Sequence, residues 1–88
     1  MNIEELRNKI DIIDTELVKL FQERMKTASQ IADYKKENGL PVFDAERERK
    51  VIGKVTSNVS EEIVPYAETL YNTIFDLSRS YQKKRMSR

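Results

Sequence analysis

The feature that most constrains this sequence is an uninterrupted helical pattern from Ile3 to Asn38, which contains neither glycine nor proline. Its apolar residues recur in steps of three, four or multiples of these, which places them on one face of an α-helix. They are Ile3, Leu6, Ile10, Ile13, Leu17, Leu20, Ala28 and Ile31. Asn38-Gly39, followed by Leu40-Pro41, is typical of a helix C-terminus.

Such a helix is roughly 50 Å long at about 1.5 Å per residue. The remainder of an 88-residue chain is too short to cover it. We therefore expect a partner chain, in an interlocked homodimer.

Two further helices are expected after the first. Asp44 is suited to be the N-cap of a short helix that runs to about Val55. A turn-like segment follows, and a third helix opens at Ser60, with Pro65 in its first turn, where the missing N–H costs little. The expected core stripe of this helix is Ile63, Leu70, Ile74, Leu77 and Tyr81. The predicted fold class is all-α: three helices (very long, short and medium) in a single domain over residues 1–88, intertwined with a second copy.

The amino-acid composition excludes several classes of catalytic and binding site. The absence of cysteine and histidine removes a disulfide, a thiolate nucleophile and the commonest general base and metal ligand. A metal site made of carboxylates alone stays possible, but no acidic cluster has calcium-loop spacing, so we expect no metal. Sixteen Lys+Arg against fifteen Asp+Glu give a net charge of +1, which does not indicate a nucleic-acid binder. The acidic start lacks the apolar run of a signal peptide and no stretch reaches a membrane span, so we expect a cytoplasmic protein with no membrane partner.

Two cations interrupt the apolar stripe of the long helix. Arg24 lies one heptad from both Leu17 and Ile31, and Lys35 follows Ile31 by four residues. An unpaired cation is costly to desolvate, so the pair could face an anion or a water-filled cavity. The alternative is that each side chain snorkels from the edge of the core or pairs with a carboxylate of another helix.

Arg7 lies about 100° around the helix from Arg24 and some 25 Å away along its axis. It cannot serve the same pocket in the same chain. One interpretation is a surface ion pair with Asp11. In an antiparallel dimer, however, Arg7 could reach the middle of the partner's long helix.

The remaining candidates lie on the two shorter helices. Asp44, Arg47 and Glu48 belong to a charge run that is either a solvated helix start or one wall of a site. Ser78 and Gln82 are one turn apart on the third helix, where they could hydrogen-bond into a cavity or simply mark the edge of the buried face.

Together these residues resemble the AroQ-type, all-helical chorismate mutase family, and the resemblance covers essentially the whole chain. The residues that carry it are Leu6-Arg7-Asn8-Lys9-Ile10-Asp11, Asp14, Glu23-Arg24, Lys35, Pro41-Val42, Asp44, Arg47-Glu48, Ser78 and Gln82. The resemblance implies an intertwined homodimer with two active sites, each completed by both chains. It also implies conversion of chorismate to prephenate, in phenylalanine and tyrosine biosynthesis, by an intramolecular Claisen rearrangement without a cofactor.

The resemblance also implies a role for each residue. Arg24 and the partner chain's Arg7 would clamp the substrate carboxylates, and Lys35 and Gln82 would donate to the ether oxygen. Glu48 would accept from the ring hydroxyl, Ser78 would bind a carboxylate, and Asp44 and Arg47 would contribute at the edge of the site. Phe75 and Arg79 depart from the aliphatic residues common at their positions in the family.

Three alternatives stay open at this stage. An isochorismate-pyruvate lyase would have the same fold and a comparable set of cations. A regulatory domain, excised from a longer fused enzyme, would bind chorismate or prephenate without turnover. A helical interaction module could use the basic tail, Lys83-Lys84-Arg85-Met86-Ser87-Arg88, to attract nucleic acid weakly.

Overall fold

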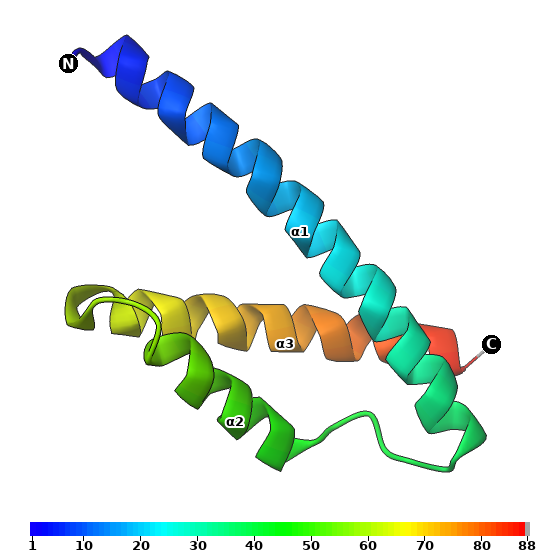
Figure 1. Cartoon of the computed structure of the whole chain (residues 1–88). Coiled ribbons are helices and arrows are strands. Elements are labelled where there is room, and N and C mark those ends of the chain that lie inside the picture. The colour runs from blue at the N-terminus through cyan, green and yellow to red at the C-terminus, as the bar shows by residue number, and fades with distance from the viewer. Residues whose placement is uncertain (88) are drawn as a thin grey trace.

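The computed structural model describes residues 1–87, which form three α-helices and one short 3₁₀ helix without any strand (Figure 1). The elements are α1 (Ile3–Glu37), α2 (Ala45–Thr56), η1 (Glu61–Ile63) and α3 (Val64–Met86). The prediction of an all-α fold with a very long, a short and a medium helix is confirmed. None of these helices combines the length and the apolarity needed to cross a membrane.

Local sequence signals determine where α1 begins and ends. Asn2 caps its first turn, because its side-chain oxygen accepts from the backbone N–H of Glu5 at 2.9 Å. At the other end Gly39 adopts a φ of 64°, in the left-handed region that glycine enters without a steric penalty. The N–H of Leu40 then donates to the carbonyl of Lys35 at 2.8 Å, the hydrogen bond of a Schellman motif.

α2 begins where the sequence predicts, but the third α-helix begins at Val64, four residues after the predicted start at Ser60. The Asp44 carboxylate accepts from the backbone N–H of Arg47 at 3.1 Å and caps α2. η1 follows Ser60 and leads directly into α3, with Pro65 in the first turn. These two starts orient the charged residues of α2 and the polar residues of α3.

Both α1 and α2 pack against α3, whereas α1 and α2 make no close backbone contact within residues 1–87. Small side chains let α1 approach α3 closely: Ala28, Ser29 and Ala32 of α1 are buried. The buried residues of α3 are Ala67, Phe75, Ser78 and Gln82. Figure 1 shows α1 crossing the C-terminal half of α3, with α2 lying beside α3.

The predicted core stripe of α3 is wrong for the single chain. Ile63, Leu70, Leu77 and Tyr81 remain 38–51% exposed, and Ile74 is only partly buried. The face that packs on α1 is the adjacent row, which runs from Ala67 to Gln82. Periodicity identifies an apolar row, but it does not identify which neighbour covers that row.

The N-terminal half of α1 projects beyond the other helices (Figure 1). The radius of gyration is 16.1 Å, against about 12 Å for a compact domain of this length. Five residues that the sequence assigned to the stripe of α1 are 43–58% exposed here: Ile3, Leu6, Ile10, Ile13 and Leu17. The chain alone therefore leaves a long apolar row without a neighbour.

Candidate functional site

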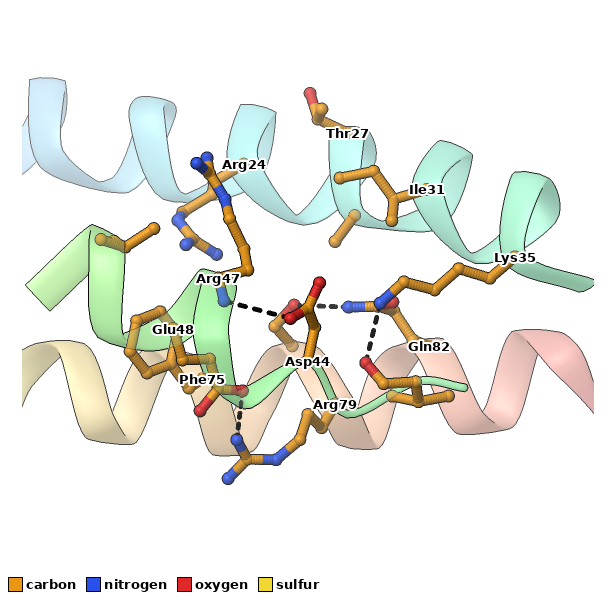
Figure 2. A pocket seen from close by; sticks show the side chains of 14 residues that line it. Arg24, Thr27, Ile31, Lys35, Asp44, Arg47, Glu48, Phe75, Arg79 and Gln82 are labelled. Atoms are coloured by element: carbon orange, nitrogen blue, oxygen red, sulfur yellow. Dashed lines mark hydrogen bonds and ion pairs between the residues drawn. The ribbon is translucent and has the colours of Figure 1, made fainter. Parts of the chain in front are cut away.

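A cleft of about 370 Å³ lies between α1 and α2, with α3 along its base. Seven of the eight predicted site residues line it: Arg24, Lys35, Asp44, Arg47, Glu48, Ser78 and Gln82. Figure 2 shows Arg24 and Arg47 at one end of the cleft and Lys35 and Gln82 at the other. Residues far apart in the sequence thus converge on one space.

Two aromatic rings hold Arg24 from below. Its guanidinium carbon lies 5.8 Å from the ring centroid of Tyr71 and 6.0 Å from that of Phe75. The two rings meet edge to face, with centroids 6.0 Å apart. The ring faces attract the cation without neutralising it, and no carboxylate within residues 1–87 pairs with Arg24. The guanidinium N–H groups therefore stay available to an anion.

Lys35 is oriented by the loop that follows α1. Its Nζ donates to the backbone carbonyl of Val42 at 2.7 Å. An ammonium has three donors, so this contact fixes the direction of the side chain and leaves two donors over. Lys35 is partly buried, which makes an anionic or polar acceptor in the cleft favourable.

The first turn of α2 contributes both signs of charge. The Asp44 carboxylate is occupied as the N-cap, and the Arg47 side chain extends across the cleft toward α1 (Figure 2). Glu48 is half-buried and forms an ion pair with Arg79 of α3. The hydrogen bond to Glu48 raises the pKa of Arg79 above its ordinary value, so the guanidinium stays protonated.

Sequence reasoning noted Arg79 only as a departure from the family and assigned it no role. The structure places it in the lining of the cleft, in contact with Glu48. The spacing along α3 gave no signal, because Arg79 immediately follows Ser78 and successive residues of a helix point in different directions.

Ser78 and Gln82 form the polar base of the cleft, and both are 7% exposed. The Gln82 amide nitrogen donates to the Ser78 hydroxyl at 3.0 Å. The Gln82 amide oxygen, Oε1, is buried and has no hydrogen-bond partner within the described residues. A buried polar atom without a partner costs about 1–3 kcal/mol, and a ligand in the cleft can remove that cost.

Arg7 does not line the cleft. It lies on the projecting part of α1, exposed, with a guanidinium nitrogen 3.9 Å from a Glu4 carboxylate oxygen. The sequence suggested Asp11 as its surface partner, and the structure pairs it with Glu4 instead. The i,i−3 neighbour is within reach on the same side of the helix.

The other charged features of residues 1–87 lie outside the cleft. These residues contain no group of three or more His, Cys, Asp and Glu side chains arranged to hold a metal ion. In the basic tail, Arg85 donates to both carboxylate oxygens of Asp33, at 2.9 and 3.0 Å. One tail cation is thereby engaged in joining α3 to α1. Arg88 lies outside the described residues.

Comparison with known proteins identifies the family of the chain. The family model described as chorismate mutase type II matches residues 6–83. A chorismate mutase of Methanocaldococcus jannaschii is 31% identical over 85 residues, which cover 91% of this chain and 83% of that protein. No solved structure matches significantly.

Two further relatives are longer than this chain. A bifunctional chorismate mutase/prephenate dehydratase of Aquifex aeolicus is 42% identical over 60% of this chain, and the match spans 15% of that enzyme. The T-protein of Haemophilus influenzae is 41% identical over 52% of this chain, and the match spans 12% of it. The expected family, the all-helical fold and the isomerase class are confirmed, and the chain belongs to the type II chorismate mutase family.

Proposed function

We propose that this chain converts chorismate to prephenate, in the biosynthesis of phenylalanine and tyrosine, as a single mutase domain over residues 1–88. The observation that carries the proposal is the convergence of Arg24, Lys35 and Arg47 on one cleft beside the buried amide of Gln82. Cations brought together without matching carboxylates are stabilised by an anion, and chorismate is a dicarboxylate.

The reaction requires neither a base nor a nucleophile. In the rearrangement one C–O bond breaks and one C–C bond forms within the same molecule, and no proton is transferred. The protein must hold the folded dianion and stabilise the negative charge that develops on the ether oxygen. The chain supplies donors and cations for both tasks.

Lys35 and Gln82 are the proposed donors to the ether oxygen. The bond from Lys35 to the Val42 carbonyl sets the direction of the ammonium. The Gln82 carboxamide can rotate by half a turn, so that the Ser78 hydroxyl donates to Oε1 and Nε2 replaces the unpartnered atom. Nε2 then donates to the ligand. Because a glutamine donor needs no protonation, we expect no acid-shifted optimum on its account.

The remaining residues bind the substrate. Arg24, held by its two aromatic neighbours, clamps one carboxylate, where a bidentate guanidinium contact is strongest. Ser78 binds a carboxylate, Glu48 accepts from the ring hydroxyl, and Asp44 and Arg47 act at the edge of the site.

We further propose that the second carboxylate is held by Arg7 of the partner subunit, in an intertwined homodimer. The support is the row of exposed apolar residues on the projecting half of α1, which ends close to Arg24. A second copy, packed antiparallel along this row, would bury it and bring its own Arg7 to the cleft. A cytoplasmic location stays a prediction from the sequence; subcellular fractionation would test it.

The direct test is the loss of chorismate absorbance with the purified protein, without added metal or nucleotide, and with prephenate confirmed by acid conversion to phenylpyruvate. We expect robust turnover. Turnover of isochorismate to pyruvate instead would establish the lyase. Tight binding of prephenate with no turnover of either substrate would establish a sensor domain.

A further inference from the structure

Arg79 connects three segments around the cleft, and the proposed mechanism assigns it no task. Its Nη1 donates to Oε2 of Glu48 on α2, and its Nη2 donates to Oδ1 of Asp76 at 2.5 Å. Its guanidinium carbon lies 5.2 Å from the ring centroid of Phe43, in the loop before α2. The arginine is thus fixed on several sides, and it fixes one carboxylate oxygen in turn.

Burial distinguishes the two ion pairs of Arg79. The Arg79 and Glu48 side chains are 26% and 24% exposed, whereas Asp76 is 72% exposed. A partly buried charge-assisted bond is stronger and less screened than an exposed one. Asp76 therefore orients the guanidinium, and the bond to Glu48 is the one that matters inside the cleft.

Glu48 has a specific electrostatic problem in the proposed function. Its negative charge would face a substrate that carries two more. The other cations of the cleft, Arg24, Lys35 and Arg47, are needed for the substrate itself. A dedicated cation beside Glu48 removes most of this repulsion.

We infer that Arg79 is a positioning residue: it holds Glu48 through Oε2 and offsets its charge, so that Oε1 accepts from the substrate's ring hydroxyl. Oε1 receives no hydrogen bond from residues 1–87, so it is the oxygen left for the ligand. This inference rests on the proposed function. It makes recognition of the hydroxyl a property of the Arg79–Glu48 pair rather than of Glu48 alone.

The test is a double-mutant cycle in the full chain, with Arg79→Met, Glu48→Gln and the combination. Chorismate turnover, prephenate binding by calorimetry and thermal melting are measured for each variant. The hydroxyl is held in both ground and transition states, so the effect belongs mainly in KM. We expect Arg79→Met to raise KM and the prephenate Kd by about tenfold with kcat changed by less than about threefold.

The cycle separates positioning from a structural role. In the Glu48→Gln background, Arg79→Met should change KM by less than about twofold, because the negative charge that Arg79 holds and offsets is already gone. Arg79→Lys keeps the positive charge but loses the two-pronged donor geometry of the guanidinium. It should recover part of the affinity for prephenate even if Arg79→Met proves poorly folded. Arg49→Met, an exposed arginine next to Glu48, is the matched control and should behave as wild type.

Two results would overturn the inference. One is an equal rise of KM in both Glu48 backgrounds; the other is a lower melting temperature with unchanged KM and Kd. Failure of the proposed function looks different, because the wild-type chain itself would then not turn over chorismate. In that case both proposals fall together.

Discussion

Mixing two inactive variants provides the sharpest test of the shared site. Arg7 and Arg24 are seventeen residues apart on one straight helix, which separates them by about 26 Å. No substrate in a cleft of about 370 Å³ can contact both within one chain. If the proposed dimer is right, Arg7→Ala and Arg24→Ala each remove one arginine from every site of their own homodimer. Loss of such a charged hydrogen bond is worth about 1.5–3 kcal/mol, or roughly 10- to 100-fold in kcat/KM.

The heterodimer distributes these substitutions unequally. One of its two sites carries both intact arginines and the other carries neither. Random exchange of equal amounts gives about half heterodimers, so about one quarter of the wild-type activity should return. Each parent alone stays at about 1–10% of wild-type activity, by the same estimate of roughly 10- to 100-fold loss.

The assay uses the two variants with different tags, unfolded together and refolded, with heterodimers verified by native mass spectrometry. Chorismate turnover is then compared with that of each variant refolded with itself. Activity that stays at the mean of the two parents, despite proven heterodimers, would refute the shared site.

The remaining predictions concern single substitutions. Gln82→Ala and Lys35→Ala should each lower kcat by about 10²–10³, as removal of an oxyanion donor does, with a much smaller change in melting temperature; collapse of the fold with residual activity would contradict their roles. The Arg85 hydrogen bond lowers the pKa of Asp33, so this pair stabilises the fold at neutral pH. Asp33→Asn should therefore melt below wild type at pH 7, and the difference should shrink as the pH falls below the ordinary aspartate pKa of about 4 and vanish only below the lowered pKa of Asp33; a deficit independent of pH would exclude the linkage. Tyr71→Leu removes one of the two rings that contact the Arg24 guanidinium. It should lower kcat/KM by about 2- to 30-fold, for a cation–π contact of about 0.5–2 kcal/mol; the matched Tyr71→Phe should retain activity.

Most helix boundaries could be predicted because their causes are local, although the third α-helix starts four residues later than expected. Asn38-Gly39 supplies a left-handed residue just where the stripe ends, and Asp44 supplies an acceptor one residue before α2. Pro65 fits only the first turn of α3. Each signal acts within about one helical turn, so no knowledge of tertiary structure is needed to read it.

The buried face of α3 could not be predicted, because it is determined by how α1 packs on α3 and not by the sequence of α3 alone. The row with Leu70 and Leu77 is the more apolar, yet the single chain buries the row with Ser78 and Gln82. Side-chain size explains the outcome at the crossing, where small residues admit α1. The apolar row left outside is consistent with the second copy that the length of α1 suggested.

The Arg79–Glu48 pair was missed for a similar reason. The two residues are 31 positions apart, and each on its own reads as an ordinary surface charge. Only the packing of α2 on α3 brings them together and excludes part of the water around them. Arg24 and Lys35 could be found, in contrast, because they interrupt an apolar pattern on a single helix.

The geometry of the crossing links the stability of the fold to the chemistry of the cleft. Ala28 and Ala32 bring the backbone of α1 close to α3, and Arg24 and Lys35 lie one turn beyond on either side. The long side chains of Arg24 and Lys35 therefore lie on either side of the helix contact rather than within it. From there they reach the cleft between α1 and α2. A larger residue at either alanine would separate α1 from α3 and widen that space, so the donors on the two helices could no longer reach the same ligand. The small residues at the crossing set the distance between α1 and α3. The long side chains of the site must span that distance, so the two sets of residues depend on each other.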